Sequence, residues 1–262
     1  MKLISKKSFA SLLSVVLLVS FRINVSAEEN YNWYFKAAGD GKQPLLLDGK
    51  EIVNHPSLLA AGNPDEKVIY LTFDAGYSTE NVVKTLDVLK EENVTAAFFI
   101  LPAIYKYTPE IARRMIDEGH TVCNHTLSHK NVSGMTFEQF KGEISGLEAE
   151  YEKYTGAKMA KFFRPPEGSF SENTLKYCEE LGYKCVFWSF AYADWDNNAQ
   201  KDREWATNII LSNIHNGEVL LLHPNSKTNA DILSDVIRTL KNEGFTFGSL
   251  EKLSKYKEQR NV

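Results

Sequence analysis

The segment KVIYLTFDAG, residues 67–76, is the part of this 262-residue chain that decides the fold. Its run of apolar side chains ends at Asp74, and Gly76 follows two residues later. Residues 219–222, VLLL, form a second continuous apolar run near the other end of the chain. Strands that are covered on both faces of a parallel sheet have this unbroken apolar pattern. The two runs therefore predict buried parallel strands.

Outward from these runs, expected strands and helices alternate along the chain. Thr136 and Gln139 form a capping box at the start of a long helix, and Gly119, Gly182 and Gly244 each stand between a helix and the next strand. Seven strands separated by helices predict an α/β fold, an irregular (β/α)7 barrel resembling a distorted TIM barrel. The expected strands are residues 68–74, 95–100, 121–124, 162–164, 184–190, 218–223 and 246–249, and the expected helices are 80–92, 109–118, 136–156, 171–182, 202–215 and 229–243.

Residues 1–27 have the composition of a secretory signal peptide. Three lysines near the N-terminus precede an apolar run over residues 9–21, which is too short for an ordinary membrane span. Small residues at 25–27 offer a cleavage point before Glu28. We therefore expect a secreted protein that acts outside the cytoplasm. An uncleaved segment that attaches the protein to the membrane is the alternative.

Residues 28–66 differ in composition from the rest of the chain. They are rich in Gly and Pro, which predicts an irregular N-terminal arm lying on the main domain of residues 67–262. The aromatic run NWYF, residues 32–35, is the expected hydrophobic attachment of this arm. No composition shift within residues 67–262 indicates a second catalytic domain.

Charge and cysteine content exclude some functions. Without residues 1–27, which contain four basic residues and no acidic one, the formal charge falls from −4 to −8. A mildly acidic chain without a basic run is a poor partner for nucleic acid. Cys123, Cys178 and Cys185 form no CxxC motif and are expected to be small buried residues. Pairing of Cys178 with Cys185 is the alternative.

Polar residues occur where the expected strands end. Because the carboxyl ends of parallel strands meet at one face of a barrel, where active sites are built, side chains at these positions should share one site. A single polar residue there would be unremarkable, whereas several indicate a function. The residues are Asp74, His125, Arg164, Asp194 and His223.

Taken one at a time, these residues have ordinary structural explanations. Asp74 could cap a turn, Arg164 could lie on the surface, and Asp194 could belong to a turn. His125 and His129, in HTLSH, could be half-exposed loop residues, although two imidazoles four residues apart can also bind one divalent cation. A nearby carboxylate such as Asp74 could then take a proton from a metal-bound water. Ala75 stands where such a site could use a second carboxylate.

Five motifs in order resemble the polysaccharide deacetylases of carbohydrate esterase family 4, the NodB-homology domain. They are TFDAG at 72–76, HTLSH at 125–129, RPPEG at 164–168, Asp194-Trp195, and LLH at 221–223. Within this family, NWYFK at 32–36, FWSFAYADW at 187–195 and the missing second aspartate are similar to the spore-cortex muramic-δ-lactam deacetylases. Those enzymes remove acetyl groups from N-acetylmuramic acid in peptidoglycan whose peptide has been removed.

The resemblance implies a catalytic role for each matching residue. Asp74 would be the general base, and Arg164 would pair with it and keep it ionised. His223 would be the general acid that protonates the leaving amine, with Asp194 orienting it. His125 and His129 would bind a divalent metal, either zinc or Mn, Co or Mg.

The resemblance also implies substrate contacts and a weak metal site. Leu221, Trp195 and Tyr77 would contact the acetyl group and the sugar, and the backbone N–H of Glu167 would donate to the oxyanion. Because Ala75 cannot bind the metal, only two protein ligands remain where catalytic zinc sites usually have three. We expect weak metal binding, with water or Asp74 in the vacant positions.

These expectations describe a monomeric, metal-assisted hydrolase that cleaves an amide bond of the peptidoglycan glycan strand. Its predicted reaction is the de-N-acetylation of N-acetylmuramic acid during muramic-δ-lactam formation in the spore cortex. Two alternatives stay open. The chain could deacetylate another glycan, such as an N-acetylglucosamine polymer, chitin or acetylxylan, or bind glycan without catalysis because of Ala75. No nucleic acid is expected as a partner, and membrane contact is expected only through an uncleaved N-terminal segment.

Overall fold

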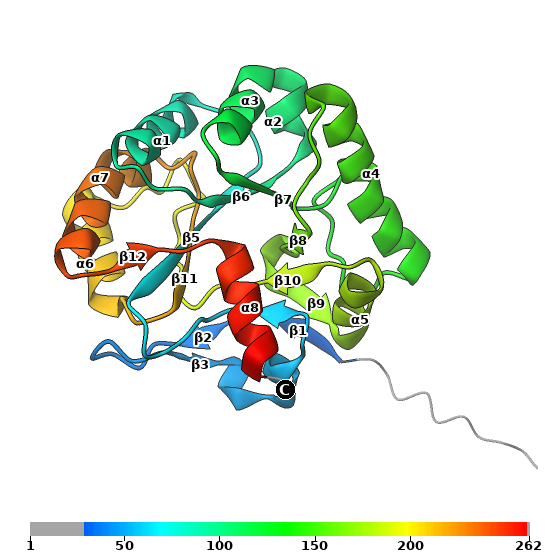
Figure 1. The fold of residues 1–262 in the computed structure, drawn as a ribbon, viewed down its shortest axis with the longest axis horizontal. Coiled ribbons are helices and arrows are strands. Elements are labelled where there is room, and N and C mark those ends of the chain that lie inside the picture. Colours follow the sequence, from blue (N-terminus) through cyan, green and yellow to red (C-terminus); the bar gives the residue numbers. More distant parts are fainter. Residues whose placement is uncertain (1–28, 261–262) are drawn as a thin grey trace, which may run out of the picture.

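A curled parallel sheet lies at the centre of the computed structural model, which describes residues 29–260 (Figure 1). Its strands follow the order β11-β5-β6-β7-β8-β10-β4, with β12 beside the start of β5. A bridge between Phe190 and Leu220 brings the chain after β10 alongside β11, so the sheet curls around an axis. The predicted irregular (β/α)7 barrel is confirmed. The sheet consists of β4 (Leu58–Leu59), β5 (Val68–Ala75), β6 (Ala97–Ile100), β7 (Thr121–Asn124), β8 (Phe162–Phe163), β10 (Lys184–Val186), β11 (Glu218–Leu222) and β12 (Thr246–Phe247).

Helices surround the sheet, and the ends of α4 follow the predicted signals, whereas α2 was not predicted and α7 begins two residues before the expected Asn229. The long helix α4 has the expected capping box between Thr136 and Gln139, and Gly156 ends it in the left-handed conformation at φ 71°. Ser226 caps α7 by accepting a hydrogen bond from the backbone of Asn229. The helices are α1 (Glu80–Glu91), α2 (Pro102–Tyr107), α3 (Pro109–Asp117), α4 (Phe137–Thr155), α5 (Glu172–Glu180), α6 (Arg203–Asn213), α7 (Lys227–Asn242) and α8 (Leu250–Arg260).

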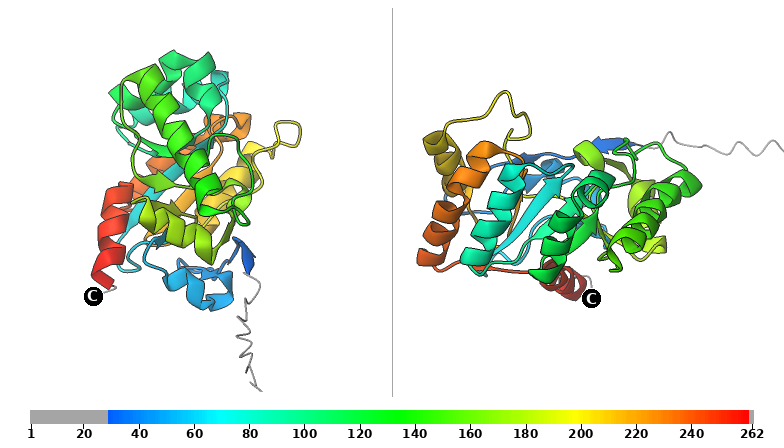
Figure 2. Two further views of the ribbon diagram at one scale, coloured as in Figure 1. Left: turned by 90° about the vertical axis from the view of Figure 1, so that its right-hand side faces the viewer. Right: turned by 90° about the horizontal axis from the view of Figure 1, so that it is seen from above.

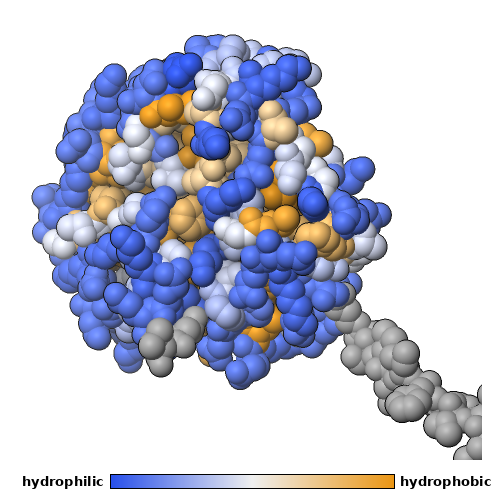
Figure 3. Space-filling model, turned by 45° about the vertical axis from the view of Figure 1, so that its right-hand side comes forward, coloured by the Kyte–Doolittle hydropathy of each residue, from blue (hydrophilic) through white to orange (hydrophobic). Residues whose placement is uncertain are grey.

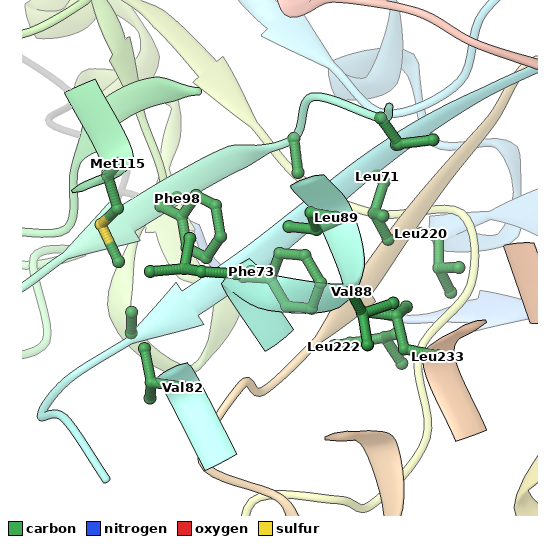
Figure 4. Close-up of a cluster of buried hydrophobic side chains, with 14 of the residues drawn as sticks. Leu71, Phe73, Val82, Val88, Leu89, Phe98, Met115, Leu220, Leu222 and Leu233 are labelled. Atoms are coloured by element: carbon green, nitrogen blue, oxygen red, sulfur yellow. The ribbon is translucent and has the colours of Figure 1, made fainter. Parts of the chain in front are cut away.

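Side chains of β5 alternate between two environments. Leu71, Phe73 and Ala75 belong to the apolar cluster between the sheet and the helices, where Phe73 stacks on Phe98 at 5.0 Å between ring centroids (Figure 4). Tyr70 belongs to a second cluster inside the barrel, and Thr72 and Asp74 share its face of the strand. This alternation places the Asp74 carboxylate inside the barrel and the Ala75 methyl group outside it.

Helix α8 closes the barrel at the amino ends of its strands. Leu250 and Leu253 join the interior cluster together with Val68 and Tyr70 of β5. The sequence pattern did not predict this helix, because α8 buries few apolar side chains over its length. With one end sealed by apolar residues, the polar end of the barrel is the one at the carboxyl ends of the strands.

The N-terminal arm is more regular than expected. Its two-residue strand β4 pairs in parallel with β10, and β1 (Asn30–Asn32) pairs antiparallel with β9 (Ser169–Ser171). The remaining arm strands, β2 (Phe35–Lys36) and β3 (Leu45–Leu46), pair with each other. Strands of two or three residues are too short to show a periodic pattern, which is why the sequence did not predict these pairings within the arm.

Trp33 provides the hydrophobic attachment expected within residues 32–35. Its ring is 6% exposed and stacks on Phe187 at 4.3 Å, and its Nε1 donates to the carbonyl of Trp188 at 2.8 Å. By contrast, Tyr34 is exposed. The arm is therefore fastened to the chain segment that follows β10.

The exterior is mostly hydrophilic, with apolar side chains in separate patches on the face that Figure 3 shows. Cys123, Cys178 and Cys185 are all buried and carry free thiols, as the simpler interpretation predicted. Within residues 29–260, none of the helices has the length and apolar character that crossing a membrane requires. The predicted signal peptide lies outside the described residues.

Candidate active site

A cavity of about 700 Å³ opens at the carboxyl ends of the strands. The loop between β10 and α6, yellow in Figure 2, stands out from the barrel beside it. All the polar residues predicted for the site, apart from Arg164 and Asp194, line this cavity, and those two lie directly behind Asp74 and His223. The cavity is lined by Asp74, Gly76, Tyr77, Leu101, His125, His129, Glu167, Gly168, Trp188, Ala191, Tyr192, Trp195, Leu221, His223 and Asn225.

Asp74 and Arg164 form a buried ion pair at the base of the cavity. Arg164, which is 0% exposed, donates from Nη1 to Asp74 Oδ1 at 2.7 Å and from Nη2 to the Thr72 hydroxyl at 2.8 Å. Its guanidinium also lies 4.1 Å from the ring centre of Phe99. Burial disfavours ionised Asp74, but the charge and hydrogen bond of Arg164, together with the histidines nearby, outweigh this and lower the pKa of the carboxyl below its ordinary value. Asp74 is therefore held as an anion that faces the cavity.

Asp194 and His223 form the second pair. Asp194 Oδ1 accepts a hydrogen bond from His223 Nδ1 at 2.7 Å, and Oδ2 accepts one from the His223 backbone at 2.8 Å. Burial acts to lower the pKa of His223, but the hydrogen bond and charge of Asp194 more than compensate and raise it above its ordinary value. The imidazole is thereby held protonated, with Nε2 available as a proton donor.

Two more buried side chains support this second pair. The Asn229 side chain donates from Nδ2 to Asp194 Oδ2 and to the carbonyl of His223. Tyr192 in turn donates its hydroxyl proton to Asn229 Oδ1. Asn229 is 1% exposed and Tyr192 is 9% exposed, so water has little access to this network.

The HTLSH segment forms a tight loop after β7 rather than a helical turn. Thr126 and His129 both have left-handed backbone conformations, with φ of 72° and 54°. Hydrogen bonds from Thr126 N to Asn124 Oδ1 and from His129 N to Thr126 Oγ1 hold this loop. Non-glycine residues adopt such conformations at an energetic cost that functional loops often carry. The loop brings the rings of His125 and His129 to a centroid distance of 5.0 Å.

His125 is oriented for binding a ligand through Nε2. The carbonyl of Arg164 only accepts hydrogen bonds, so its 2.9 Å contact identifies Nδ1 of His125 as the protonated nitrogen. The lone pair of Nε2 then faces the cavity, 3.7 Å from Asp74 Oδ2. Burial lowers the pKa of His125 to about 4, so the ring is neutral at physiological pH, the form that binds a metal.

The donor set at this point is a pair of imidazoles beside one carboxylate. Within residues 29–260, no three His, Cys, Asp or Glu side chains are grouped as a complete metal site. The two histidines therefore fit a divalent ion as partial ligands, and the remaining positions would be left to water or to Asp74. Ala75, where a second carboxylate could have stood, is 1% exposed and packs in the apolar cluster outside the barrel.

The chain matches known proteins over most of its length. A family model described as polysaccharide deacetylase matches residues 61–186. The chain is 39% identical to the peptidoglycan-N-acetylmuramic acid deacetylase PdaA of Bacillus subtilis, over 88% of this chain and 89% of that one. The chain belongs to the polysaccharide deacetylase family.

Further relatives of this polysaccharide deacetylase support the same assignment. A solved structure of Bacillus subtilis PdaA, described as a family 4 carbohydrate esterase, superposes with a TM-score of 0.81 and 39% identity, covering 86% of this chain and 97% of that one. A peptidoglycan-N-acetylglucosamine deacetylase of Bacillus cereus is 32% identical over 76% of this chain and 73% of its own. The predicted family is thus confirmed.

The remaining predicted contacts of the deacetylase lie on the cavity wall. Leu221 is buried at the end of β11, while Trp195 and Tyr77 are exposed at 61% and 47%. Tyr77 accepts hydrogen bonds from Asn197 and Asn225, so it ties the loop after β10 to the loop after β5. Exposed aromatic rings at the mouth of such a cavity are suited to packing against the faces of a sugar.

Glu167 occupies a strained turn behind Arg164. It has a φ of 57° between Pro166 and Gly168, and its side chain is exposed. A Cβ atom on Gly168 would lie 2.9 Å from atoms of Trp33 and Trp188, so only glycine fits there. The backbone of Trp33 also donates to the Gly168 carbonyl at 2.9 Å. The arm therefore supports the turn that contains the Glu167 N–H.

Sequence reasoning missed Thr72, Asn229, Tyr192 and Asn225. Thr72 had a usable signal, because it is a polar residue two positions before Asp74 and therefore on the same face of a strand. Asn229 and Tyr192 had none, because they act through side-chain contacts between segments 37 residues apart in the chain. Asn225 follows His223 closely, but only its hydrogen bonds to Tyr77 and Asn197 place it at the cavity.

Proposed function

We propose that this protein removes the acetyl group from N-acetylmuramic acid in the glycan strand of peptidoglycan. One observation carries the proposal. A carboxylate held ionised, Asp74, and an imidazole held protonated, His223, line the same cavity, which is the pairing of base and acid that amide hydrolysis requires.

Each residue has a defined part in the proposed reaction. Asp74 takes a proton from the attacking water while the water oxygen forms a bond to the acetyl carbonyl carbon. The backbone N–H of Glu167 donates to the oxyanion that forms, which contributes about 10²–10³-fold in rate. His223 gives its proton to the sugar nitrogen as the carbon–nitrogen bond breaks, leaving acetate and a free amine. Arg164 holds Asp74 in place, and Asp194 holds His223.

The metal proposed for this site would be held by His125 Nε2 and His129. When bound, a divalent ion acidifies a coordinated water and polarises the acetyl carbonyl. With two protein ligands, we expect it to bind weakly and to exchange readily. Zinc, manganese, cobalt and magnesium are all candidates, because two imidazoles alone do not select among them strongly.

The choice of sugar is supported by the relative at 39% identity, whose name specifies peptidoglycan N-acetylmuramic acid. We further propose that the amine formed closes to a muramic δ-lactam in the spore cortex, that the peptide has been removed beforehand, and that the enzyme is a secreted monomer with an N-terminal signal peptide. The leucine at 221 would contact the acetyl methyl group, and Trp195 and Tyr77 would contact the sugar.

The test is mass spectrometry of a peptide-free muramyl glycan after incubation with enzyme and a defined metal. We expect a mass loss of one acetyl group on muramic acid, abolished by chelator and by Asp74→Asn. Full activity of Asp74→Asn would overturn the mechanism. Acetate release from N-acetylglucosamine oligomers at an equal rate would overturn the choice of sugar, and glycan binding without acetate release would overturn the catalytic proposal.

A further inference from the structure

The hydrogen bonds around Asp194 have only one consistent direction. Asp194 Oδ2 and the carbonyl of His223 both accept hydrogen bonds, so the group of Asn229 that faces them must be its NH₂. The carbonyl oxygen of the Asn229 amide is then on the other side, where the Tyr192 hydroxyl donates to it. These two acceptors determine which way round the Asn229 amide lies, and the hydrogen bond from the Tyr192 hydroxyl supports that orientation.

This network determines where the Asp194 carboxylate points. Its Oδ2 is held by the Asn229 side chain and by the backbone N–H of His223, which leaves Oδ1 directed at His223 Nδ1 at 2.7 Å. Asn229 lies in the first turn of α7, whose backbone is anchored by the Ser226 cap at 3.2 Å. Helix α7 therefore holds the Asp194 carboxylate, which lies on a loop, in one position through Asn229.

We propose that Asn229 is a positioning residue that holds Asp194 against His223, and that the Tyr192 hydroxyl supports the orientation of Asn229. The inference rests on the proposed function only in that His223 is the general acid. Without Asn229, Oδ2 of Asp194 is held by the His223 backbone alone, and the carboxylate can turn away from the ring. Neither Asn229 nor the Tyr192 hydroxyl needs to touch the substrate for this role.

The charges that act on His223 come from three segments. Asp194 lies on the loop after β10, Asp74 on β5 and Arg164 directly after β8. The ring of Trp195 packs edge-on against the imidazole at 6.1 Å and carries no charge. Because Asp74 and Arg164 do not contact Asn229, a variant at Asn229 changes the Asp194 contribution and leaves the other two in place.

The first test compares Asn229→Leu, which keeps the side-chain size, with the wild type. We expect kcat to fall by about 10- to 100-fold, as for other misplaced catalytic groups, with KM nearly unchanged. The alkaline limb of the pH profile of kcat should move to lower pH. In the metal-free protein, histidine NMR resonances, with His223 assigned through His223→Gln, should show the same shift in the titration of His223.

Tyr192→Phe is the second variant, because Asn229→Leu could also disturb the folding of α7. It removes one hydroxyl group, and we expect a change in the same direction but smaller. Tyr105→Phe is the matched control, since Tyr105 is also buried and its hydroxyl donates a hydrogen bond to Glu150 at 3.0 Å, at a place that does not line the cavity. This control should leave both kcat and the His223 titration unchanged.

An unchanged His223 titration in folded Asn229→Leu and Tyr192→Phe would overturn the inference. The titration requires no substrate, so it decides the positioning role even if the protein deacetylates a different sugar. If the wild-type protein does not deacetylate N-acetylmuramic acid, the proposed function is overturned, but the titration result stays valid.

Discussion

Strand β11 has a histidine and a carboxylate near each of its ends, and the two pairs differ in their hydrogen bonding. Beyond its carboxyl end, Asp194 and His223 are 2.7 Å apart, and the carboxylate accepts further hydrogen bonds from backbone and from Asn229. At its amino end, His215 Nε2 and Glu218 Oε2 are 3.8 Å apart. The pair at the amino end is the more deeply buried, with 2% and 0% exposure.

The His215–Glu218 pair at the amino end lacks some of its hydrogen-bond partners. Within residues 29–260, His215 Nε2 and Glu218 Oε1 are among the few buried side-chain polar atoms without a hydrogen-bond partner. Burial raises the pKa of Glu218 well above its ordinary value and lowers the pKa of His215. Burial therefore disfavours the charged form of both groups, whereas at the other end of the strand the pKa of His223 is raised.

The comparison shows that partners, rather than burial, decide whether such a pair can do acid–base chemistry. Desolvation opposes the charge of the histidine in both pairs. Only His223 has a carboxylate close enough to reverse its effect, and only His223 borders the cavity. Variants at the two ends of β11 should consequently affect different properties of the enzyme.

The largest difference is expected when each histidine is replaced by glutamine. His223→Gln removes the proposed general acid and should lower kcat by about 10²- to 10⁴-fold. His215→Gln should leave kcat near the wild-type value, because its ring does not reach the cavity. Acetate release from peptide-free muramyl glycan measures both, and equal losses would contradict the division between the two ends.

A smaller effect, with a distinct pH signature, is expected for Asp194→Asn. Asp194 raises the pKa of His223, so the acid stays protonated and active until the pH rises through that raised value. The neutral amide removes this support, so the alkaline limb of the kcat profile should move to lower pH. The loss should be greater on the alkaline side than on the acid side, and Glu218→Gln is the control expected to keep the wild-type limb.

Ala75→Asp tests whether a carboxylate near these strand ends needs a partner. The Ala75 methyl group packs in the apolar cluster outside the barrel, with 1% exposure. An aspartate there should lower the free energy of unfolding by about 3–5 kcal/mol, the range for an unpaired buried charge. Urea unfolding with a chelator present measures this effect. Unchanged stability together with tighter metal binding would show that the new side chain turns into the cavity.

The apolar runs along the chain were sufficient to predict the barrel. The strands at 68–74 and 121–124 are long enough for their composition to identify them, and polar residues at their ends locate the face that contains the cavity. Strand β4, with two residues, has no such pattern, and only its pairing with β10 reveals it. The length of each strand therefore decided whether the sequence could predict it.

Site residues that lie at or just after the end of a strand were predictable from the sequence. Asp74, His125, Arg164 and His223 are of this kind. Asn229 is different, because its contacts with Tyr192 and Asp194 depend on how α7 packs against a loop. A sequence pattern contains local periodicity but not the packing between distant segments, so supporting residues of this type appear only in the structure.

The smallest effect is expected in the stability of Glu218→Gln, and it depends on pH. In the wild type the raised pKa of Glu218 means that the folded protein keeps a proton that the unfolded chain loses above its ordinary value of 4.5. Stability from this residue is present below that pH and is lost as the pH rises toward the folded-state pKa. His215 has the opposite sign, because its lowered pKa reduces stability as the pH falls below 6.5.

Glutamine at position 218 removes the first of these two dependences and keeps the second. The free energy of unfolding of Glu218→Gln relative to wild type should therefore increase with pH, by up to about 1.4 kcal/mol for each pH unit within the window. Urea unfolding at about pH 5 and about pH 6 measures it, with exposed Glu91→Gln on α1 as the control. If the free energies of unfolding of Glu218→Gln and the wild type change equally with pH, Glu218 is ionised in the folded protein and forms an ion pair with His215. The two ends of β11 would then be alike.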